Sequence, residues 1–332
     1  MQRISVIIPS YNRASLLESA VDSVLAQTYP PSEIIVVDDG STDETDEVLA
    51  RCRLKAQSRQ ISVHVIKQKQ GGAAKSRNAG IAASTGDWLA FLDSDDIWLP
   101  EKLELQVNAL RAFGAQSAAC VADATFVNNP GLNKTAFEYA GIADGEDYRL
   151  IDGATDRIAY GYHGLYLQSL LVKRQLAVDL EGFDAGFLLS EDSDFFLRLS
   201  LKTQILRVKR ALVKIDRTPN REIGLLEIAG NELRSFEIQR RLYEKWLDGR
   251  LDIGGASKEL IRKRLHEVHS GLASIYLRNG QFHEAKAALR KAMGYYVSAK
   301  VFTKWILATV TPGFARTLVV QKRKKDLRQP VL

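Results

Sequence analysis

Polar residues cluster directly after three apolar runs in the first hundred residues. The clusters are Pro9-Ser10-Tyr11-Asn12-Arg13, Asp38-Asp39-Gly40-Ser41 and Asp93-Ser94-Asp95-Asp96. Carboxylates at the end of an apolar strand cost desolvation energy unless a cation or hydrogen-bond donors face them. One such cluster could be a helix cap, but three together predict a ligand site.

Asp93 and Asp95 lie one residue apart on the predicted acidic turn, so both carboxylates can point at one hard cation. Mg²⁺ held by one or two carboxylates keeps positions open for phosphate oxygens. Such a metal neutralises a diphosphate leaving group in a displacement reaction. Acidic turns are common in other settings, so this interpretation depends on the residues around the turn.

The elements that must position these clusters alternate between β-rich and helical runs, as in an α/β domain with a mostly parallel sheet. Ligands bind beyond the carboxyl ends of the strands in such a sheet. The predicted strands are Ile4–Pro9, Glu33–Val37, Ile61–Lys67, Trp88–Leu92, Ala118–Val127, Gln168–Val172 and Ile205–Ile215. The predicted helices are Ala14–Gln27, Ser41 or Thr42 to about Ala56, Ala73–Ser84, Glu101–Phe113 and Asp192–Leu201. Residues 128–165 show no sustained period, and we expect a functional loop there.

From about Arg221 the pattern is helical only. It predicts a helix over Glu222–Trp246 and a pair, Lys258–Asn279 with Gln281–Met293, that resembles one tetratricopeptide unit. The segment Val301–Val320 precedes a basic tail that contains Lys322-Arg323-Lys324-Lys325. Two outcomes are expected for this segment: it lies on an anionic membrane surface, or it packs against the helical pair.

Composition limits the cellular setting. An apolar run begins already at Ile4, and no stretch of about 18 apolar residues is present, so neither a signal peptide nor a transmembrane helix is expected. Cys52 and Cys120 are expected to be buried free thiols in a reducing compartment. We therefore expect a cytoplasmic protein, with peripheral contact to the inner face of the cell membrane through the tail as an option. With a modest net charge of +6, the basic tail is expected to be a solvated end, and binding to nucleic acid or to anionic lipid are the alternatives. No nucleic-acid partner is expected for the protein, and nothing indicates an oligomeric state.

Five motifs resemble those of glycosyltransferase family 2, the inverting enzymes with the GT-A nucleotide-diphospho-sugar transferase fold. They are Ser5–Asn12, Ile34–Asp43, Arg77-Asn78-Ala79-Gly80 with Gly86-Asp87, Phe91–Asp96, and Gly182-Phe183-Asp184 with Glu191-Asp192. The resemblance covers about residues 1–215. It implies a GT-A domain over residues 1–220, with a donor half at about 1–127 and an acceptor half at about 128–220. A helical extension would then occupy residues 221–332.

The resemblance also implies roles for individual residues. Nucleotide-sugar contacts would come from Pro9, Tyr11, Asp39, Arg77, Asp93 and Ser94. Among these, Pro9 and Tyr11 would bracket the base, and Asp39 would hydrogen-bond to it. Asp95 would be the principal ligand of Mn²⁺ or Mg²⁺, supported by Asp93. Asp96 would orient its neighbours or cap the next helix.

Three acids near the fifth motif compete for the role of general base. The resemblance favours Asp192, with Glu191 as the second catalytic candidate, whereas Asp194 is expected to face solvent at the start of its helix. A well-placed base contributes about 10²–10⁴-fold to the rate. Many relatives also place a metal-binding His after the last strand, where this chain has Asp216-Arg217-Thr218-Pro219. His163 is the remaining candidate for that ligand.

The function favoured by these motifs is the inverting transfer of a sugar from a nucleotide-diphosphate sugar, preferably a UDP-sugar. The acceptor would be a glycan or a lipid-linked glycan in cell-surface polysaccharide synthesis. One alternative is a scaffold that binds nucleotide-sugar in a degenerate transferase site. Another is a nucleotidyltransferase, although no Gly-rich phosphate loop follows the first strand. A dehydrogenase is disfavoured because no GxGxxG follows any strand.

Overall fold

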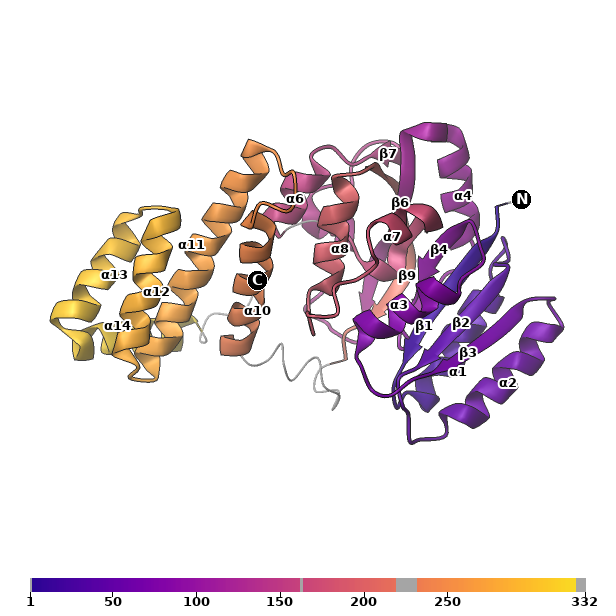
Figure 1. Cartoon of the computed structure of the whole chain (residues 1–332), viewed down its shortest axis with the longest axis horizontal. Coiled ribbons are helices and arrows are strands. Elements are labelled where there is room, and N and C mark those ends of the chain that lie inside the picture. The colour runs from indigo at the N-terminus through magenta and orange to yellow at the C-terminus, as the bar shows by residue number, and fades with distance from the viewer. Residues whose placement is uncertain (1, 162–163, 219–231, 327–332) are drawn as a thin grey trace. The chain divides into compact units, whose positions relative to one another are not determined.

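The structure is a computed structural model, and it describes residues 2–161, 164–218 and 232–326 (Figure 1). The chain divides into two compact units, Met1–Pro219 and Asn220–Leu332. Within the described part of the first unit, nine strands form one sheet with helices around it. The second unit is helical. The predicted fold class, a mostly parallel α/β sheet followed by helices, is thereby confirmed.

The strands of the sheet follow the order β3-β2-β1-β4-β8-β6-β9-β5, with β7 also paired to β9. They are β1 (Ile4–Ser10), β2 (Glu33–Asp38), β3 (Ser62–Lys67), β4 (Trp88–Phe91), β5 (Ile97–Trp98), β6 (Ser117–Val127), β7 (Tyr148–Leu150), β8 (Leu170–Lys173) and β9 (Gln204–Asp216). Strands β3, β2, β1 and β4 are parallel, and β8 lies antiparallel between β4 and β6. Every residue of β2 is buried, as expected for a strand covered on both faces.

The register places the carboxyl ends of the first strands side by side. Ser10 at the end of β1 pairs with Asp38 at the end of β2, and Ile7 pairs with Phe91 at the end of β4. The loops that carry the polar clusters therefore leave the sheet at one edge. This edge is where open parallel sheets bind ligands.

Helices cover the sheet and close its crossovers. They are α1 (Ala14–Leu25), α2 (Thr45–Gln57), α3 (Ala73–Ala83), α4 (Lys102–Phe113), α5 (Ala136–Ala140), α6 (Ala154–Tyr160), α7 (Arg174–Asp179) and α8 (Glu191–Ser200). The turns η1 (Gly114–Gln116) and η2 (Leu167–Ser169) precede β6 and β8. Helix α1 buries Leu17, Val21 and Val24, which recur at helical spacing.

The structure differs from the sequence prediction between residues 128 and 165. This stretch contains α5, β7 and α6 rather than a loop alone. Each of these elements is three to seven residues long, which is too short to produce a readable period in the sequence. Both cysteines are buried free thiols, as predicted.

The second unit consists of α10 (Glu232–Leu247), α11 (Gly255–Arg278), α12 (Phe282–Tyr295), α13 (Ala299–Val310) and α14 (Pro312–Asp326). Residues 222–231, part of the first predicted helix, lie outside the described residues. Gly271 of α11 lies against the ring of Phe236 in α10. A Cβ at this position would come within 2.4 Å of Phe236 Cε1, so the close packing requires a glycine. Within the described residues, no helix combines the length and the apolar character needed to cross a bilayer.

Candidate active site

The loops that follow β1 and β2 are joined by hydrogen bonds. Asn12 has a positive φ of 48°, its Oδ1 accepts a hydrogen bond from the backbone N–H of Thr42 at 2.8 Å, and its own N–H donates to Ser41 Oγ at 3.0 Å. The half-buried Pro9 and Tyr11 lie next to this junction in the chain. Their contact with the donor base stays a prediction. The loop after β1, which carries both residues, is held in place by the loop after β2.

Asp39 is buried and is directed at the turn that precedes α3. Its Oδ1 accepts hydrogen bonds from Gly71 N–H at 2.9 Å and from Gln68 Nε2 at 2.6 Å, and its Oδ2 accepts one from Gly72 N–H at 2.8 Å. Gly72 has a φ of +87°, a conformation that a side chain at this position would disfavour. Asp39 therefore anchors the glycine turn, a role that was not predicted, and its contact with a base stays a prediction.

The acidic turn after β4 is joined to the end of the last strand. Buried Asp96 accepts a hydrogen bond from the backbone N–H of Asp216 at 2.8 Å. Burial, with the nearby charges of Asp93 and Asp95, raises the pKa of Asp96 well above its ordinary value. Asp96 does not cap the next helix, since the residue before α4 is Glu101. It holds the turn in place.

Arg77 of α3 bridges two acids from distant parts of the sequence. Its Nη2 donates to Asp93 Oδ1 at 2.7 Å and its Nη1 donates to Glu191 Oε1 at 2.6 Å. The guanidinium is buried and lies 5.6 Å from the ring centroid of Phe183. Among the described residues its Nε has no hydrogen-bond partner.

Two carboxyl groups share the positive charge of Arg77. Burial lowers the pKa of Arg77, but the carboxylates of Asp93 and Glu191 outweigh this effect and raise it overall, so Arg77 remains charged. Burial also raises the pKa of Glu191, although the charge of Arg77 opposes this. One buried cation therefore serves two carboxyl groups, one on the donor side and one on the acceptor side. The contact of Arg77 with nucleotide stays a prediction.

A buried polar network supports the acidic turn from within the fold. Gln168 donates through Nε2 to Asp93 Oδ2, and its carbonyl accepts a hydrogen bond from Trp98 Nε1 at 2.8 Å. The Lys102 ammonium lies 3.9 Å from the Trp98 ring centroid and donates to Gln106 Oε1 at 2.8 Å. Burial lowers the pKa of Lys102 to about 7.

The buried network formed by Gln168, Lys102 and Gln106 was not predicted from the sequence. A signal was present: Lys102 and Gln106 alternate with Leu103, Val107 and Leu110 on the apolar face of a helix. Polar residues at such positions indicate buried hydrogen bonds.

The three acids in the first turn of α8 have different surroundings. Glu191 is held by Arg77. Asp194 is fully buried, and its Oδ2 accepts a hydrogen bond from Arg198 Nε at 2.8 Å. The expectation that Asp194 faces solvent is therefore wrong, because it lies on the inward face of α8 and Arg198, one turn later, compensates its charge. Asp192 lines a pocket instead.

The fifth sequence motif is joined to the third by a pair of hydrogen bonds. Asn78 Nδ2 donates to the carbonyl of Phe183 at 2.7 Å, and Asn78 Oδ1 accepts the N–H of Phe183 at 2.8 Å. Gly182 has a φ of +62°, and a Cβ there would come within 2.3 Å of Asn78 Oδ1. This contact explains why a glycine and an asparagine stand at these positions.

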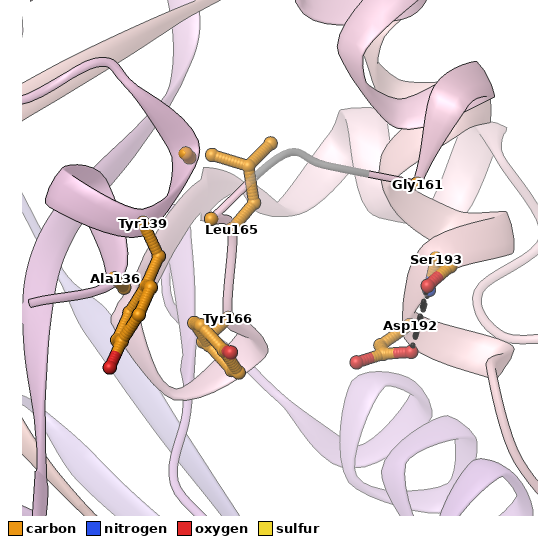
Figure 2. Close-up of a pocket in the computed structure, with 9 residues that line it drawn as sticks. Ala136, Tyr139, Gly161, Leu165, Tyr166, Asp192 and Ser193 are labelled. Atoms are coloured by element: carbon orange, nitrogen blue, oxygen red, sulfur yellow. Dashed lines mark hydrogen bonds between the residues drawn. The ribbon is translucent and has the colours of Figure 1, made fainter. Parts of the chain in front are cut away.

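The pocket beside α8 has a volume of about 300 Å³. Figure 2 shows Tyr139 and Tyr166 on one side of it and Asp192 with Ser193 on the other. Asp192 Oδ1 accepts the N–H of Ser193 at 2.7 Å. The guanidinium of Arg217 lies 5.7 Å from the Tyr166 ring centroid. The pocket thus combines an aromatic wall with a carboxylate wall.

Two partly exposed carboxylates of the acidic turn are the candidate metal ligands. Asp93 and Asp95 have similar side-chain exposures of 28% and 26%, and Arg13 Nη2 lies 3.7 Å from Asp95 Oδ2. In the part of the chain that the structure describes, no group of three or more His, Cys, Asp or Glu is placed to hold a metal ion. His163 lies outside the described residues. The metal role of Asp95 therefore stays a prediction.

Comparisons with known proteins identify the family. The model of glycosyl transferase family 2 matches residues 5–173, so the chain belongs to this family. An uncharacterized glycosyltransferase (alr2836) of Nostoc sp. is 48% identical over 102 residues, which are 31% of this chain and 31% of that protein. TuaG of Bacillus subtilis, provisionally named a teichuronic acid biosynthesis glycosyltransferase, is 44% identical over 105 residues, or 31% of this chain and 40% of that protein. The match therefore spans well under half of either relative's own length.

Solved structures share the fold. S. aureus TarS (residues 1–349), crystallised with UDP-GlcNAc, superposes with a TM-score of 0.70 at 21% identity, over 98% of this chain and 92% of that one. The mannosyltransferase PcManGT of Pyrobaculum calidifontis, in complex with GDP-Man and Mn²⁺, gives a TM-score of 0.57 at 20% identity, over 99% and 88%.

Proposed function

Since the chain belongs to glycosyl transferase family 2, we propose that it is an inverting glycosyltransferase. It would move a sugar from a nucleotide-diphosphate sugar to a glycan or lipid-linked acceptor in cell-surface polysaccharide synthesis. The observation that carries this proposal is the position of Asp192 on a pocket beside α8, next to the group in which Arg77 joins Glu191 to Asp93. The proposed catalytic domain is residues 1–220, with residues 221–332 as an extension.

Asp192 is the proposed general base. Glu191 and Asp194 each form an ion pair with an arginine, so their carboxylates are engaged within the fold. Asp192 lines the pocket and is the acid of this turn that an acceptor hydroxyl could reach. Glu191 then becomes a positioning residue that fixes the start of α8 through Arg77.

The proposed step is a single displacement. The acceptor oxygen forms a bond to the anomeric carbon while the bond from that carbon to the phosphate oxygen breaks. Asp192 takes the proton of the acceptor hydroxyl, and the nucleoside diphosphate leaves with the electron pair. Attack from the face opposite the leaving group inverts the configuration at the anomeric carbon.

The donor site is proposed at the carboxyl ends of β1, β2 and β4. The nucleobase of the donor would lie between Pro9, Tyr11 and Asp39. Asp93 and Ser94 would contact the remainder of the nucleotide-sugar. UDP-sugars are the first candidates because TarS was crystallised with UDP-GlcNAc. GDP-mannose is a second candidate, since PcManGT was solved with it.

The acidic turn fits a divalent cation that takes most of its ligands from the donor. Asp95 is partly exposed, and Asp93 keeps a free lone pair on each oxygen beside its bonds to Arg77 and Gln168. Mg²⁺ and related ions are commonly held by one or two carboxylates plus phosphates and water. When bound, the ion would neutralise charge on the leaving diphosphate. PcManGT, which shares the fold and was solved with Mn²⁺, supports this proposal.

The pocket beside α8 is proposed as the acceptor site. Sugar rings present C–H faces that pack on aromatic side chains, and Tyr139 and Tyr166 offer such faces opposite Asp192. TuaG, with its provisional teichuronic acid name, favours a polysaccharide acceptor. We place the reaction in the cytoplasm.

The test is Asp192→Asn with a panel of nucleotide-sugars and glycan acceptors. We expect transfer to fall about 10²–10⁴-fold while donor affinity, measured by calorimetry with Mn²⁺, stays unchanged. The matched control is Asp179→Asn, an exposed acid of the same unit outside the site. Undiminished transfer by Asp192→Asn would remove the base assignment, and a product with retained anomeric configuration by NMR would remove the mechanism.

The same panel separates an enzyme from a scaffold. The scaffold alternative is favoured by one observation, the lack of a three-residue metal cluster among the residues that the structure describes. A scaffold would bind UDP-sugar in calorimetry yet release no UDP with any acceptor. An enzyme would release UDP only in the presence of its acceptor or, slowly, water.

A further inference from the structure

Helix α13 is apolar on both of its faces. Val301 and Ala308 are buried against the rest of the helical unit. Phe302, Ile306 and Val310 recur every four residues on the opposite side, and they are 48%, 40% and 72% exposed. A helix with two apolar faces normally has both of them covered, and none of the described residues of the same unit covers the outer face of α13.

The next helix repeats this arrangement. In α14, Ala315 is buried while Phe314 and Leu318, four residues apart, are 56% and 41% exposed. Helices α13 and α14 pack against each other at one end of the helical unit (Figure 1). We call Phe302, Ile306, Val310, Phe314 and Leu318 the exposed apolar set. Single exposed apolar residues are ordinary, but five on two adjoining helices mark an interaction surface.

The charge of this segment is one-sided. Between Glu284 and Asp326 the sequence has ten Lys or Arg residues and no Asp or Glu. Lys300 and Arg316 are exposed on α13 and α14 themselves. The partner of the exposed apolar set must therefore carry negative charge and must also offer an apolar region into which aliphatic and aromatic side chains can pack.

We propose that α13 and α14 lie on an anionic lipid surface, with the exposed apolar set entering the headgroup region and the basic residues contacting acidic headgroups. Aliphatic Ile, Val and Leu favour hydrocarbon over a polyanionic glycan or a nucleic acid, which offer aromatic stacking and hydrogen bonds instead. A second copy of the chain is disfavoured because two such segments would bring twenty positive charges together. This proposal does not depend on the transferase assignment.

The test is co-sedimentation of the full chain with vesicles of phosphatidylcholine alone and with vesicles that also contain 30% phosphatidylglycerol. We expect binding to the second kind only, weakening as salt rises. The triple variant F302S/I306S/V310S is expected to lose at least about tenfold in partitioning. The variant K322Q/R323Q/K324Q/K325Q is expected to lose about fivefold per residue, which corresponds to about 1 kcal/mol for each charge.

The matched control is L54S/V178S, which removes two exposed apolar side chains from the first unit. It should bind anionic vesicles like the unchanged chain. Folding of each variant is checked by far-ultraviolet circular dichroism, and the substituted apolar side chains are exposed, so the helices should persist.

Four outcomes would overturn the proposal. The first is that the chain binds neither kind of vesicle, and the second is that it binds both kinds equally. The third is that the triple variant and the control bind anionic vesicles equally well. The fourth is a chain that ignores vesicles but self-associates, or binds only heparin or an oligonucleotide, through the exposed apolar set. Sedimentation velocity and a heparin column identify that last case.

Discussion

Replacing Lys102 by Met is expected to remove a large pH dependence from the stability of the first unit. The side chain is fully buried, and its ammonium has Gln106 and the Trp98 ring as its neighbours. Burial lowers its pKa from the ordinary 10.5 to about 7. Keeping Lys102 protonated in the folded protein therefore costs free energy of folding.

The sign and size follow from proton binding in the two states. Between pH 7 and 10.5 the unfolded chain binds the Lys102 proton and the folded chain does not, so the free energy of unfolding rises with pH at about 1.4 kcal/mol per unit. Below pH 7 both states are protonated and the full cost, on the order of 5 kcal/mol, remains. Lys102→Met removes this cost, although Gln106 loses a donor worth about 1–3 kcal/mol.

The useful window is pH 7 to 9. Burial raises the pKa of Cys52 to about 11 and that of Cys120 to about 12, so above pH 9 their ionisation in the unfolded chain opposes the lysine effect. Within the window, the stability advantage of Lys102→Met over the unchanged chain should shrink by about 3 kcal/mol.

The assay is native-state hydrogen exchange of the α4 amides in increasing urea, at pH 7, 8 and 9, which reports the opening free energy of this unit alone. Lys173→Met, at an exposed lysine, is the control. Parallel pH slopes for Lys102→Met and the unchanged chain would refute the reasoning, as would a variant that is less stable at pH 7.

Three further substitutions test the site. Arg77→Met leaves the buried Glu191 and the partly exposed Asp93 without their cation and should cost about 3–5 kcal/mol in urea unfolding, with partial recovery in Arg77→Lys; a loss under 1 kcal/mol would show that the bridge is dispensable. Gly182→Ala should cost more than about 2 kcal/mol, since it adds a clash with Asn78 to the strain of a positive φ, whereas Gly153→Ala, which has φ +62° and open space, should cost only about 1 kcal/mol. Asp96→Asn should stabilise the protein at pH 7 but much less at pH 4. The pKa of Asp96 is raised in the folded protein, so the free energy of unfolding of the unchanged chain falls as the pH rises above the pKa of this carboxyl in the unfolded chain. Equal effects of the substitution at both pH values would contradict this.

The long periodic elements of the fold could be predicted from the sequence. Helix α1 and strand β2 were predicted to within two residues, because continuous apolar runs and helical spacing are local signals. The two-residue strand β5 and the short elements between residues 128 and 165 gave no such signal. Strands β5 and β7 form by pairing with β9, which is distant in sequence.

Several residues of the candidate site could be singled out from the sequence, whereas their pairings could not, and their roles in the reaction stay predictions. The acids and Arg77 stood out because charged groups followed apolar strands. That Arg77 would contact Glu191, 114 residues away, depends on tertiary packing. The error at Asp194 has the same origin: sequence shows a helix start that favours acids, but only the packing of α8 shows which acid is turned inward.

The shared guanidinium of Arg77 also has an evolutionary consequence. A substitution at Arg77 alone leaves the buried Glu191 without its cation, so this single mutational step passes through an unstable protein, whereas loss of Asp93 alone still leaves Arg77 paired with Glu191. A viable lineage that loses Arg77 must therefore change Glu191 as well. We expect the codons of Arg77 and Glu191 to change together, even though they lie in segments that are far apart along the gene.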